Sequence, residues 1–314
     1  MKRILACMLC IVLCMSAGVA YAAHINIVTA GTASTFYPIS ATVVGLWNEH
    51  IKGMRAVATP SGGGIDNLNQ AYDGEAQIGI ANANLVYQAQ EGLEAFEGYA
   101  NENLRIFAGL YINPNQVVVT KASGIDSLSD LLGKRISIGA AGATTIDEAI
   151  VHLETAGMRL EDIRAEYMDT SAAADAVSNK LLDGVWVMAG TPNAAVTQIM
   201  TTTDSMLMPI TAEEVEALRA VYPWYAETEI PAGTYPGQDD AVPTSGVKLT
   251  LFITADVDEE TVYQMTKIFW ENWEMLCENH AALQKADPKK VCEDIAGVKI
   301  HEGAARYYRE IGLM

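Results

Sequence analysis

The sequence predicts an α/β fold of two lobes, each a mostly parallel sheet flanked by helices. A short apolar strand, a loop of small residues and a helix of similar length recur about six times along the chain. With 314 residues, the chain is long for one domain and comfortable for two. Two segments, residues 116–120 and 246–250, are expected to cross between the lobes. A hinge of two crossing segments is therefore predicted.

Residues 1–22 have the features of a secretory signal peptide. Lys2 and Arg3 precede an apolar run, and Ala20-Tyr21-Ala22 is a small-x-small cleavage motif. The apolar run is too short to span a bilayer. We expect cleavage after Ala22 and export to the periplasm.

No lipid anchor is expected on the exported chain. Cys7 leaves no apolar run before it, and Leu13 stands before Cys14 where a lipoprotein signal needs a small residue. Cys277 and Cys292 remain in the mature chain, in an oxidising compartment. The sequence leaves open whether these two cysteines form a disulfide or are buried thiols.

The first lobe is assigned residues 23–117 and 247–314. Asn113-Pro114-Asn115 is expected to form a turn between two of its strands, and Asp256 and Asp258 are expected to cap a long helix. The expected strands are residues 25–29, 56–59, 77–81, 107–111, 116–120 and 247–254, and the expected helices are residues 36–51, a helix from about 66, one through 87, and 261–278 and 304–311.

The second lobe is assigned residues 118–246. Its expected strands are residues 136–138, 166–168 and 185–189, and its expected helices are 127–132, those that follow residues 145, 172 and 193, and 212–221. Pro192 is placed in a first helical turn, where proline is tolerated.

The stretch at residues 134–150 shows the repeated pattern most clearly. A β-branched strand ends at Gly139, small residues follow, and Thr144 or Thr145 can cap the next helix. Asp147 and Glu148 fall in its first turn. The free N–H groups of such a helix start favour an anion.

Ligands of open α/β sheets lie beyond the carboxyl ends of the strands, where helix starts converge. The loops there contain Gly, Ala, Ser, Thr and Asn but no Lys or Arg between residues 29 and 35, 59 and 66, or 139 and 146. Backbone amides around residues 32–35 and 142–145 are expected to hold a carboxylate, with side-chain amides providing specificity. Each loop taken alone is more simply explained as a plain turn, and only the convergence of several loops favours a site. The predicted ligand-binding residues are Gly31, Thr32, Ser34, Thr35, Tyr37, Gly62, Gly63, Asn82, Asn84, Gly142, Ala143, Thr144, Thr145, Gly190, Thr191 and Asn193.

Catalysis, metal binding and nucleic-acid binding find little support. No nucleophile elbow, zinc-protease motif or phosphate loop occurs in the mature chain, and the five histidines are scattered. A net charge of −19 opposes binding to nucleic acid or to an anionic membrane surface. We therefore predict no catalytic residue, no cofactor and no metal.

The chain resembles the TAXI solute-binding proteins of tripartite ATP-independent periplasmic (TRAP) transporters over nearly all of its mature length. The resemblance lies at residues 27–38, 61–68, 130–139, 190–192, 230–238 (I-P-A-G-T-Y-P-G-Q) and 301–308 (H-E-G-A-A-R-Y-Y), the last two being the most specific. It implies a type II periplasmic binding-protein fold whose lobes close on a small organic acid, such as glutamate, glutamine or a dicarboxylate. It also implies delivery of the ligand to membrane subunits.

The chain departs from the family pattern in two ligand loops. Ala30, Ala33 and Ser34 replace glycines of the first loop, and Gly142-Ala143-Thr144-Thr145 replaces the family's G-S-G-T. These side chains bear on which ligand is bound. The alternative functions are an enzyme built on the same scaffold and a periplasmic sensor partner.

Overall fold

The computed structural model describes residues 24–32, 34–141 and 143–314. The predicted signal peptide and Gly142 lie outside these residues. Within the described chain, no helix has both the length and the apolar character needed to cross a bilayer.

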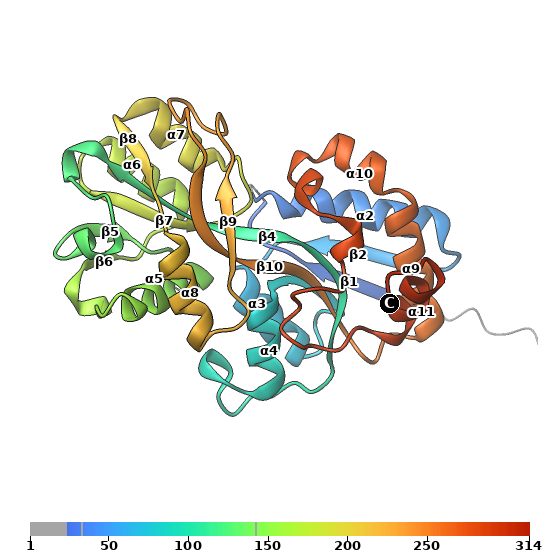
Figure 1. The fold of residues 1–314 in the computed structure, drawn as a ribbon. Coiled ribbons are helices and arrows are strands. Elements are labelled where there is room, and N and C mark those ends of the chain that lie inside the picture. Colours follow the sequence, from blue (N-terminus) through green and yellow to red (C-terminus); the bar gives the residue numbers. More distant parts are fainter. Residues whose placement is uncertain (1–23, 33, 142) are drawn as a thin grey trace, which may run out of the picture.

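The described residues form two lobes joined by one continuous sheet (Figure 1). The strands run in the order β2-β1-β3-β10-β4-β7-β5-β6, with β8 beside β4 and β9 beside β10. The strands are β1 (His24–Val28), β2 (Arg55–Thr59), β3 (Ile78–Asn82), β4 (Leu104–Thr120), β5 (Arg135–Ser137), β6 (Arg164–Glu166), β7 (Gly184–Met188), β8 (Ser205–Met208), β9 (Ala226–Ile230) and β10 (Val242–Thr254).

In each lobe the outer strands of the sheet are parallel, as predicted: β1 pairs with β2 and β3, and β5 pairs with β6 and β7. The helices are α2 (Phe36–His50), α3 (Gly64–Tyr72), α4 (Ala83–Glu91), α5 (Thr144–Thr155), α6 (Thr170–Ser178), α7 (Ala194–Thr202), α8 (Ala212–Val221), α9 (Glu259–Glu271), α10 (Trp273–Asn279) and α11 (Glu302–Glu310).

Helices cover both faces of the sheet in each lobe. On β4, Phe107 packs with α2, α9 and α11, while its neighbour Ile106 packs with α3 and α4 on the other face. Further along β4, Val117 faces α5 and α8, and Val118 faces α6 and α7. The alternation of a strand's side chains thus builds a core on each face of the sheet, so that each lobe has three layers: helices, sheet and helices.

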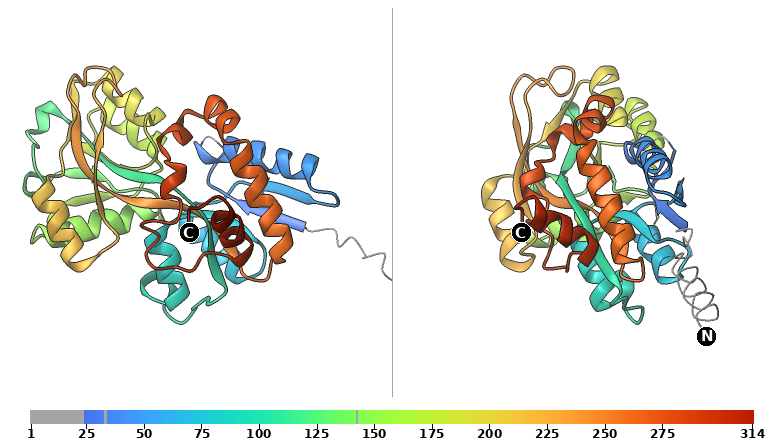
Figure 2. Two further views of the ribbon diagram at one scale, coloured as in Figure 1. Left: turned by 45° about the vertical axis from the view of Figure 1, so that its right-hand side comes forward. Right: turned by 90° about the vertical axis from the view of Figure 1, so that its right-hand side faces the viewer.

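Strands β4 and β10 are the two crossing segments. β4 pairs with β10 as far as Pro114 and with β7 from Asn115 onward. β10 changes from β9 to β4 at Gly246, where a Cβ would lie 2.5 Å from Ile112 Cγ2. Only glycine permits this close approach. Figure 2 shows both strands running from one lobe into the other.

Several predicted boundaries were wrong. Asn113-Pro114-Asn115 is part of the continuous strand β4, because pairing with β10 overrides the local turn preference. Asn193, rather than Thr191-Pro192, begins α7 as its N-cap. The long C-terminal helix is divided into α9 and α10 at Asn272, and strands β8 and β9 were not predicted.

The structure also bears on two side-chain predictions for the first lobe, a helix cap and a disulfide. Asp258 caps α9 by accepting a hydrogen bond from the Thr261 N–H group, as predicted, whereas Asp256 does not cap this helix. Cys277 and Cys292 are free thiols, each partly buried beside the core of the first lobe. The open possibility of a disulfide is therefore not realised in this structure.

Asn67 of α3 holds together the strand ends of the first lobe. Its side chain is fully buried, and its Nδ2 donates to the carbonyl oxygens of Thr29 and Ile80 at 2.7 Å each. Its Oδ1 accepts from Ser61 Oγ at 2.6 Å. One amide thus fixes the tips of β1 and β3 and the loop after β2.

We expect Asn67→Ala to lower the free energy of unfolding by about 2–4 kcal/mol, because it leaves two buried carbonyl oxygens unpaired. Urea unfolding followed by circular dichroism measures this. Asn69→Ala, an exposed position of the same helix, should change it by less than about 0.5 kcal/mol. Equal losses for both variants would contradict the assigned role of Asn67.

Candidate functional site

A stripe of polar side chains lies on β4 where this strand passes between the lobes. Tyr111, Asn113 and Asn115 occupy alternate positions and are 3%, 7% and 1% exposed. A Cβ at Gly190, just beyond β7, would lie 2.7 Å from Tyr111 Oη, and Asn113 Nδ2 donates to Asn82 Oδ1 at 3.4 Å. The stripe therefore meets the ends of β3 and β7.

The two lobes contact one another directly beside this stripe. Asn82 Nδ2, from the first lobe, lies 3.0 Å from Met188 Sδ of the second. A Cβ at Gly64, where α3 begins, would lie 3.4 Å from Cγ2 of Thr144, where α5 begins. The starts of α3 and α5, from different lobes, are thus in contact with each other.

Two of the predicted helix starts already have acceptors within the protein. Asp66 Oδ2 accepts from the Gly62 N–H group at 2.8 Å, and Ser61 Oγ accepts from the Gly63 N–H group at 3.2 Å. Ser34 Oγ accepts from the Tyr37 N–H group at 3.3 Å. In this conformation these amides are not available to an anion, so the predicted roles of Gly62, Gly63 and Ser34 are not supported.

Helices α4 and α5 begin differently. Their N-caps, Asn82 and Ala143, make no side-chain capping hydrogen bond. The prediction that Thr144 or Thr145 caps α5 was therefore wrong, since both lie inside the helix. By contrast, α6 to α9 and α11 are each capped by a side chain: Asp169, Asn193, Thr211, Asp258 and His301. The first N–H groups of α4 and α5 lack this partner and can serve a ligand.

Buried amide oxygens without partners lie next to the start of α4. Among the described residues, Asn84 Oδ1 and Asn113 Oδ1 have no hydrogen-bond donor, although each side chain is only 7% exposed. Asn82, the N-cap of α4, contacts Asn113. An unpaired buried acceptor costs about 1–3 kcal/mol. These oxygens can accept hydrogen bonds from a solute that carries N–H or O–H groups.

The remaining predicted residues have less defined roles. Gly31, Thr32 and Thr35 are exposed, and Gly142 lies outside the described residues. Thr191 is buried beside Gly190. Asn193 Oδ1 accepts hydrogen bonds from the N–H groups of Ala195 and Val196. Its side-chain oxygen therefore has partners within the protein and needs no ligand.

A buried network that the sequence did not predict joins α5 to the crossing strands. Glu148 Oε2 accepts from Asn115 Nδ2 at 3.0 Å and from Tyr225 Oη at 2.9 Å. Asn115 Nδ2 also donates to Ser245 Oγ at 3.0 Å, and His152 Nε2 lies 2.6 Å from the same hydroxyl. Glu148 and His152 are one helical turn apart on α5. No sequence motif marks this network, because its members come from four separate segments.

Burial shifts both titratable groups toward their neutral forms. It raises the pKa of Glu148 from 4.5 to about 7, although the hydrogen bonds from Asn115 and Tyr225 act in the opposite direction. Burial also lowers the pKa of His152 from 6.5 to about 4. At pH 5.5 the folded protein therefore holds a neutral carboxyl and a neutral imidazole, where the unfolded chain holds a charged pair.

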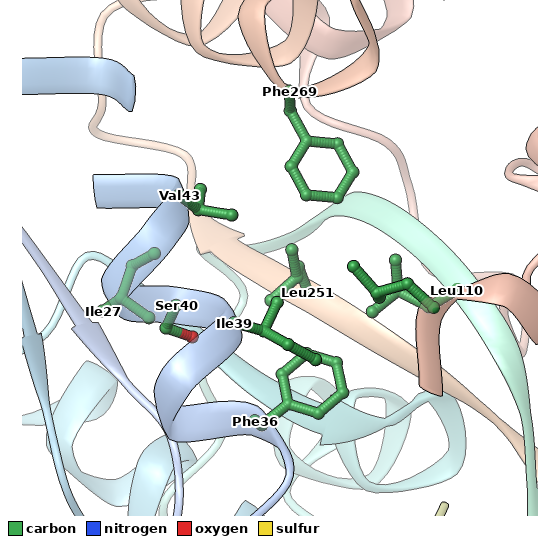
Figure 3. Close-up of a pocket in the computed structure, with 9 residues that line it drawn as sticks. Ile27, Phe36, Ile39, Ser40, Val43, Leu110, Leu251 and Phe269 are labelled. Atoms are coloured by element: carbon green, nitrogen blue, oxygen red, sulfur yellow. The ribbon is translucent and has the colours of Figure 1, made fainter. Parts of the chain in front are cut away.

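Two cavities lie apart from the stripe, and neither suits an organic anion. The first, inside the first lobe, has a volume of about 10 Å³, which is room for about one water. Figure 3 shows that its walls are carbon side chains and that Ser40 contributes the oxygen. The second, of about 210 Å³, lies between α5 and α8 and is lined by His152, Glu213 and Glu214. Its carboxylates would repel an anion.

The described residues contain no group of three or more His, Cys, Asp or Glu side chains that could hold a metal ion. The stripe and the helix starts present neutral amides, hydroxyls and backbone N–H groups. Such groups can bind a polar solute by hydrogen bonds.

Comparison with known proteins identifies the family. Residues 27–312 match the model of the NMT1-like family. The chain belongs to this family. Solved structures similar to this NMT1-like chain share its fold at low sequence identity.

A periplasmic sulfonate-binding protein SsuA from Methylobacillus flagellatus KT is 11% identical, with a TM-score of 0.55 over 93% of this chain and 95% of that one. A TctC solute-binding protein from Polaromonas is 13% identical, with a TM-score of 0.52 over 94% of this chain and 100% of that one. A structure from work on glutathione import via GshT and the cystine importer TcyBC of Streptococcus mutans is 13% identical, with a TM-score of 0.54 over 85% and 98%. The fold of the NMT1-like chain is that of periplasmic solute-binding proteins.

The shifted groups predict opposite pH dependences of stability. A raised carboxyl pKa gives stability that is present below pH 4.5 and is lost as the pH rises through about 7. A lowered imidazole pKa gives stability that is present above pH 6.5 and is lost as the pH falls through about 4. In the wild type the two contributions largely cancel.

We expect Glu148→Gln to remove this cancellation. Relative to wild type, the free energy of unfolding of the variant should rise by up to about 3 kcal/mol between pH 4.5 and 7. His152→Gln should show the opposite slope. Urea unfolding at a series of pH values measures both, with the exposed Glu154→Gln of the same helix as the control. Parallel pH profiles for Glu148→Gln and wild type would show that the carboxyl is not shifted.

Proposed function

We propose that this chain is an exported, extracytoplasmic solute-binding protein that captures a small organic anion and delivers it to the membrane subunits of a TRAP transporter. The TAXI-type motifs, the NMT1-like family and the fold support this proposal. Signal-peptide cleavage after Ala22 and a periplasmic location belong to the same proposal.

The observation on which the proposal most depends is the start of α5. Ala143 provides no cap, and Thr144 faces Gly64 of the other lobe. A solute carboxylate held there would accept hydrogen bonds from N–H groups and interact favourably with the helix dipole. It would do so between the lobes, so that binding favours their closure.

The chemistry of the stripe narrows the solute class. No Lys or Arg occurs in the loops at residues 29–35, 59–66 and 139–146. The acceptors Asn84 Oδ1 and Asn113 Oδ1 favour a solute that also has hydrogen-bond donors. A glutamate- or glutamine-like amino acid fits both features, and a dicarboxylate fits the first. Sulfonates belong in the test panel, because SsuA is named for binding them.

We propose that solute exchange occurs when the lobes separate about β4 and β10. The first lobe would comprise residues 23–117 and 247–314, and the second residues 118–246. The change of strand partners at Asn113–Asn115 and at Gly246 supports these boundaries to within a few residues.

Thr144→Pro tests the α5 site by removing one N–H group at a position where proline suits the helix. Ala143 before it is extended, as a residue preceding proline should be. We expect the dissociation constant for the bound anion to increase about 10- to 100-fold, as for loss of a hydrogen bond to a charged group. Calorimetry on refolded, ligand-free protein, with amino acids, dicarboxylates and sulfonates, measures this.

Ala212→Pro is the matched control, since Ala212 is the first residue of α8, whose start is capped by Thr211. It should bind as wild type does. If no anion of the panel binds the wild type, or if both proline variants bind equally well, the α5 site is refuted. Mass spectrometry of any small molecule that co-purifies identifies the natural solute.

Asn84→Ala should lower the affinity for the solute without lowering the stability of the protein. It removes a buried oxygen without a donor, so the free energy of unfolding of the ligand-free protein should stay constant or rise. Affinity for a solute with N–H groups should fall about 10-fold. Asn179→Ala, an exposed position after α6, should leave both unchanged. Unchanged affinity in Asn84→Ala would exclude this amide from the site.

A further inference from the structure

The segment at residues 222–225, between α8 and β9, makes an aromatic contact with the other lobe. The ring of Trp224 packs on Tyr87 of α4, with 6.0 Å between ring centroids and 44° between ring planes. The ring of Tyr222 also packs on Trp224, with 5.7 Å between their ring centroids. Figure 1 shows α4 and α8, the helices nearest to these rings, at the same lower edge of the molecule.

Tyr225 connects this contact to the buried network. Its Oη donates to Glu148 Oε2 at 2.9 Å, and its ring meets that of His152 edge-on at 5.5 Å. His152 in turn contacts Ser245 on β10. A continuous series of contacts therefore runs from α4 in the first lobe, through residues 222–225, to α5 and a crossing strand.

Acidic groups face each other at the same boundary. Burial, and after it the negative charge of Glu94 in the first lobe, raise the pKa of Asp147 on α5. Burial, and to a smaller extent the charges of Glu154 and Glu94, raise the pKa of Tyr222. Like charges across the boundary oppose closure, so an attractive contact is needed to hold the lobes together there.

We propose that residues 222–225 form an interlobe clasp: Trp224 packs on Tyr87 when the lobes close, and Tyr225 is a positioning residue that links this contact to α5 and β10 through Glu148. The clasp holds the lobes closed against the repulsion of Glu94 and Asp147. It lies beside the polar stripe but acts without a solute.

Small-angle X-ray scattering of the full mature chain, refolded without ligand, tests the clasp. Trp224→Ala and Tyr87→Ala should each lower the ratio of closed to open protein about 2- to 10-fold, the range for an aromatic pair. The radius of gyration should increase accordingly. The double variant should match the single ones, because the two rings form one contact.

Tyr99→Ala is the matched control, since Tyr99 pairs edge-on with Tyr72 within the first lobe, at 5.8 Å. It should scatter as wild type does. Near-ultraviolet circular dichroism checks folding, and the Tyr87 variant tests the contact from the opposite lobe if the Trp224 variant does not fold. Added salt should favour closure in every variant by screening the acidic groups.

Tyr225→Phe tests the link separately, because it keeps the ring and removes the hydroxyl. It should open the protein although Tyr87 and Trp224 are intact. The clasp is overturned if the two alanine variants scatter as wild type does, and the role of Tyr225 is overturned if Tyr225→Phe does so. The measurement needs no solute, so its failure would be distinct from failure of the proposed function.

Discussion

The antiparallel pairing of β4 with β10 is the constraint on which the rest of the structure depends. β4 is 17 residues long, takes partners from both lobes and contributes consecutive side chains to both cores. β4 is continuous, so the point at which it changes partners fixes how the two lobes are joined. Asn113 and Asn115 lie at that point, so a relative motion of the lobes would change the surroundings of these two polar residues.

The helix starts divide into those whose N–H groups are satisfied by the protein and those that are not. Side chains cap α6 to α9 and α11, while α4 and α5 begin without such a cap. Asn84 and Asn113 also lack internal partners: their buried side-chain oxygens have no hydrogen-bond donor among the described residues. Sites that forgo internal partners in this way are suited to an external one.

The sequence predicted the repeated strands and helices well, because apolar runs and small-residue loops are local signals. Helix α8 was predicted to the residue, and β1, β3 and β7 to within one. β9, Ala-Glu-Thr-Glu-Ile, was missed because it pairs only at the edge of the sheet. The polar stripe was taken for a turn, since only the partner strand reveals Asn113 as extended. Asn82 and Asn84 were predicted near the site. The acceptors Asp66 and Ser61 were not predicted, although they lie only four and two residues from the Gly62 and Gly63 N–H groups that donate to them.

The buried pair on α5 has a consequence for how this chain can vary. When the protein folds near pH 5.5, Glu148 takes up a proton and His152 releases one. The effects of the two groups on the pH dependence of stability are therefore opposite and largely cancel. A replacement at one position exposes the cost at its neighbour one turn away. We therefore expect relatives to keep both residues or to lose both, and a designer who changes one should change its counterpart too.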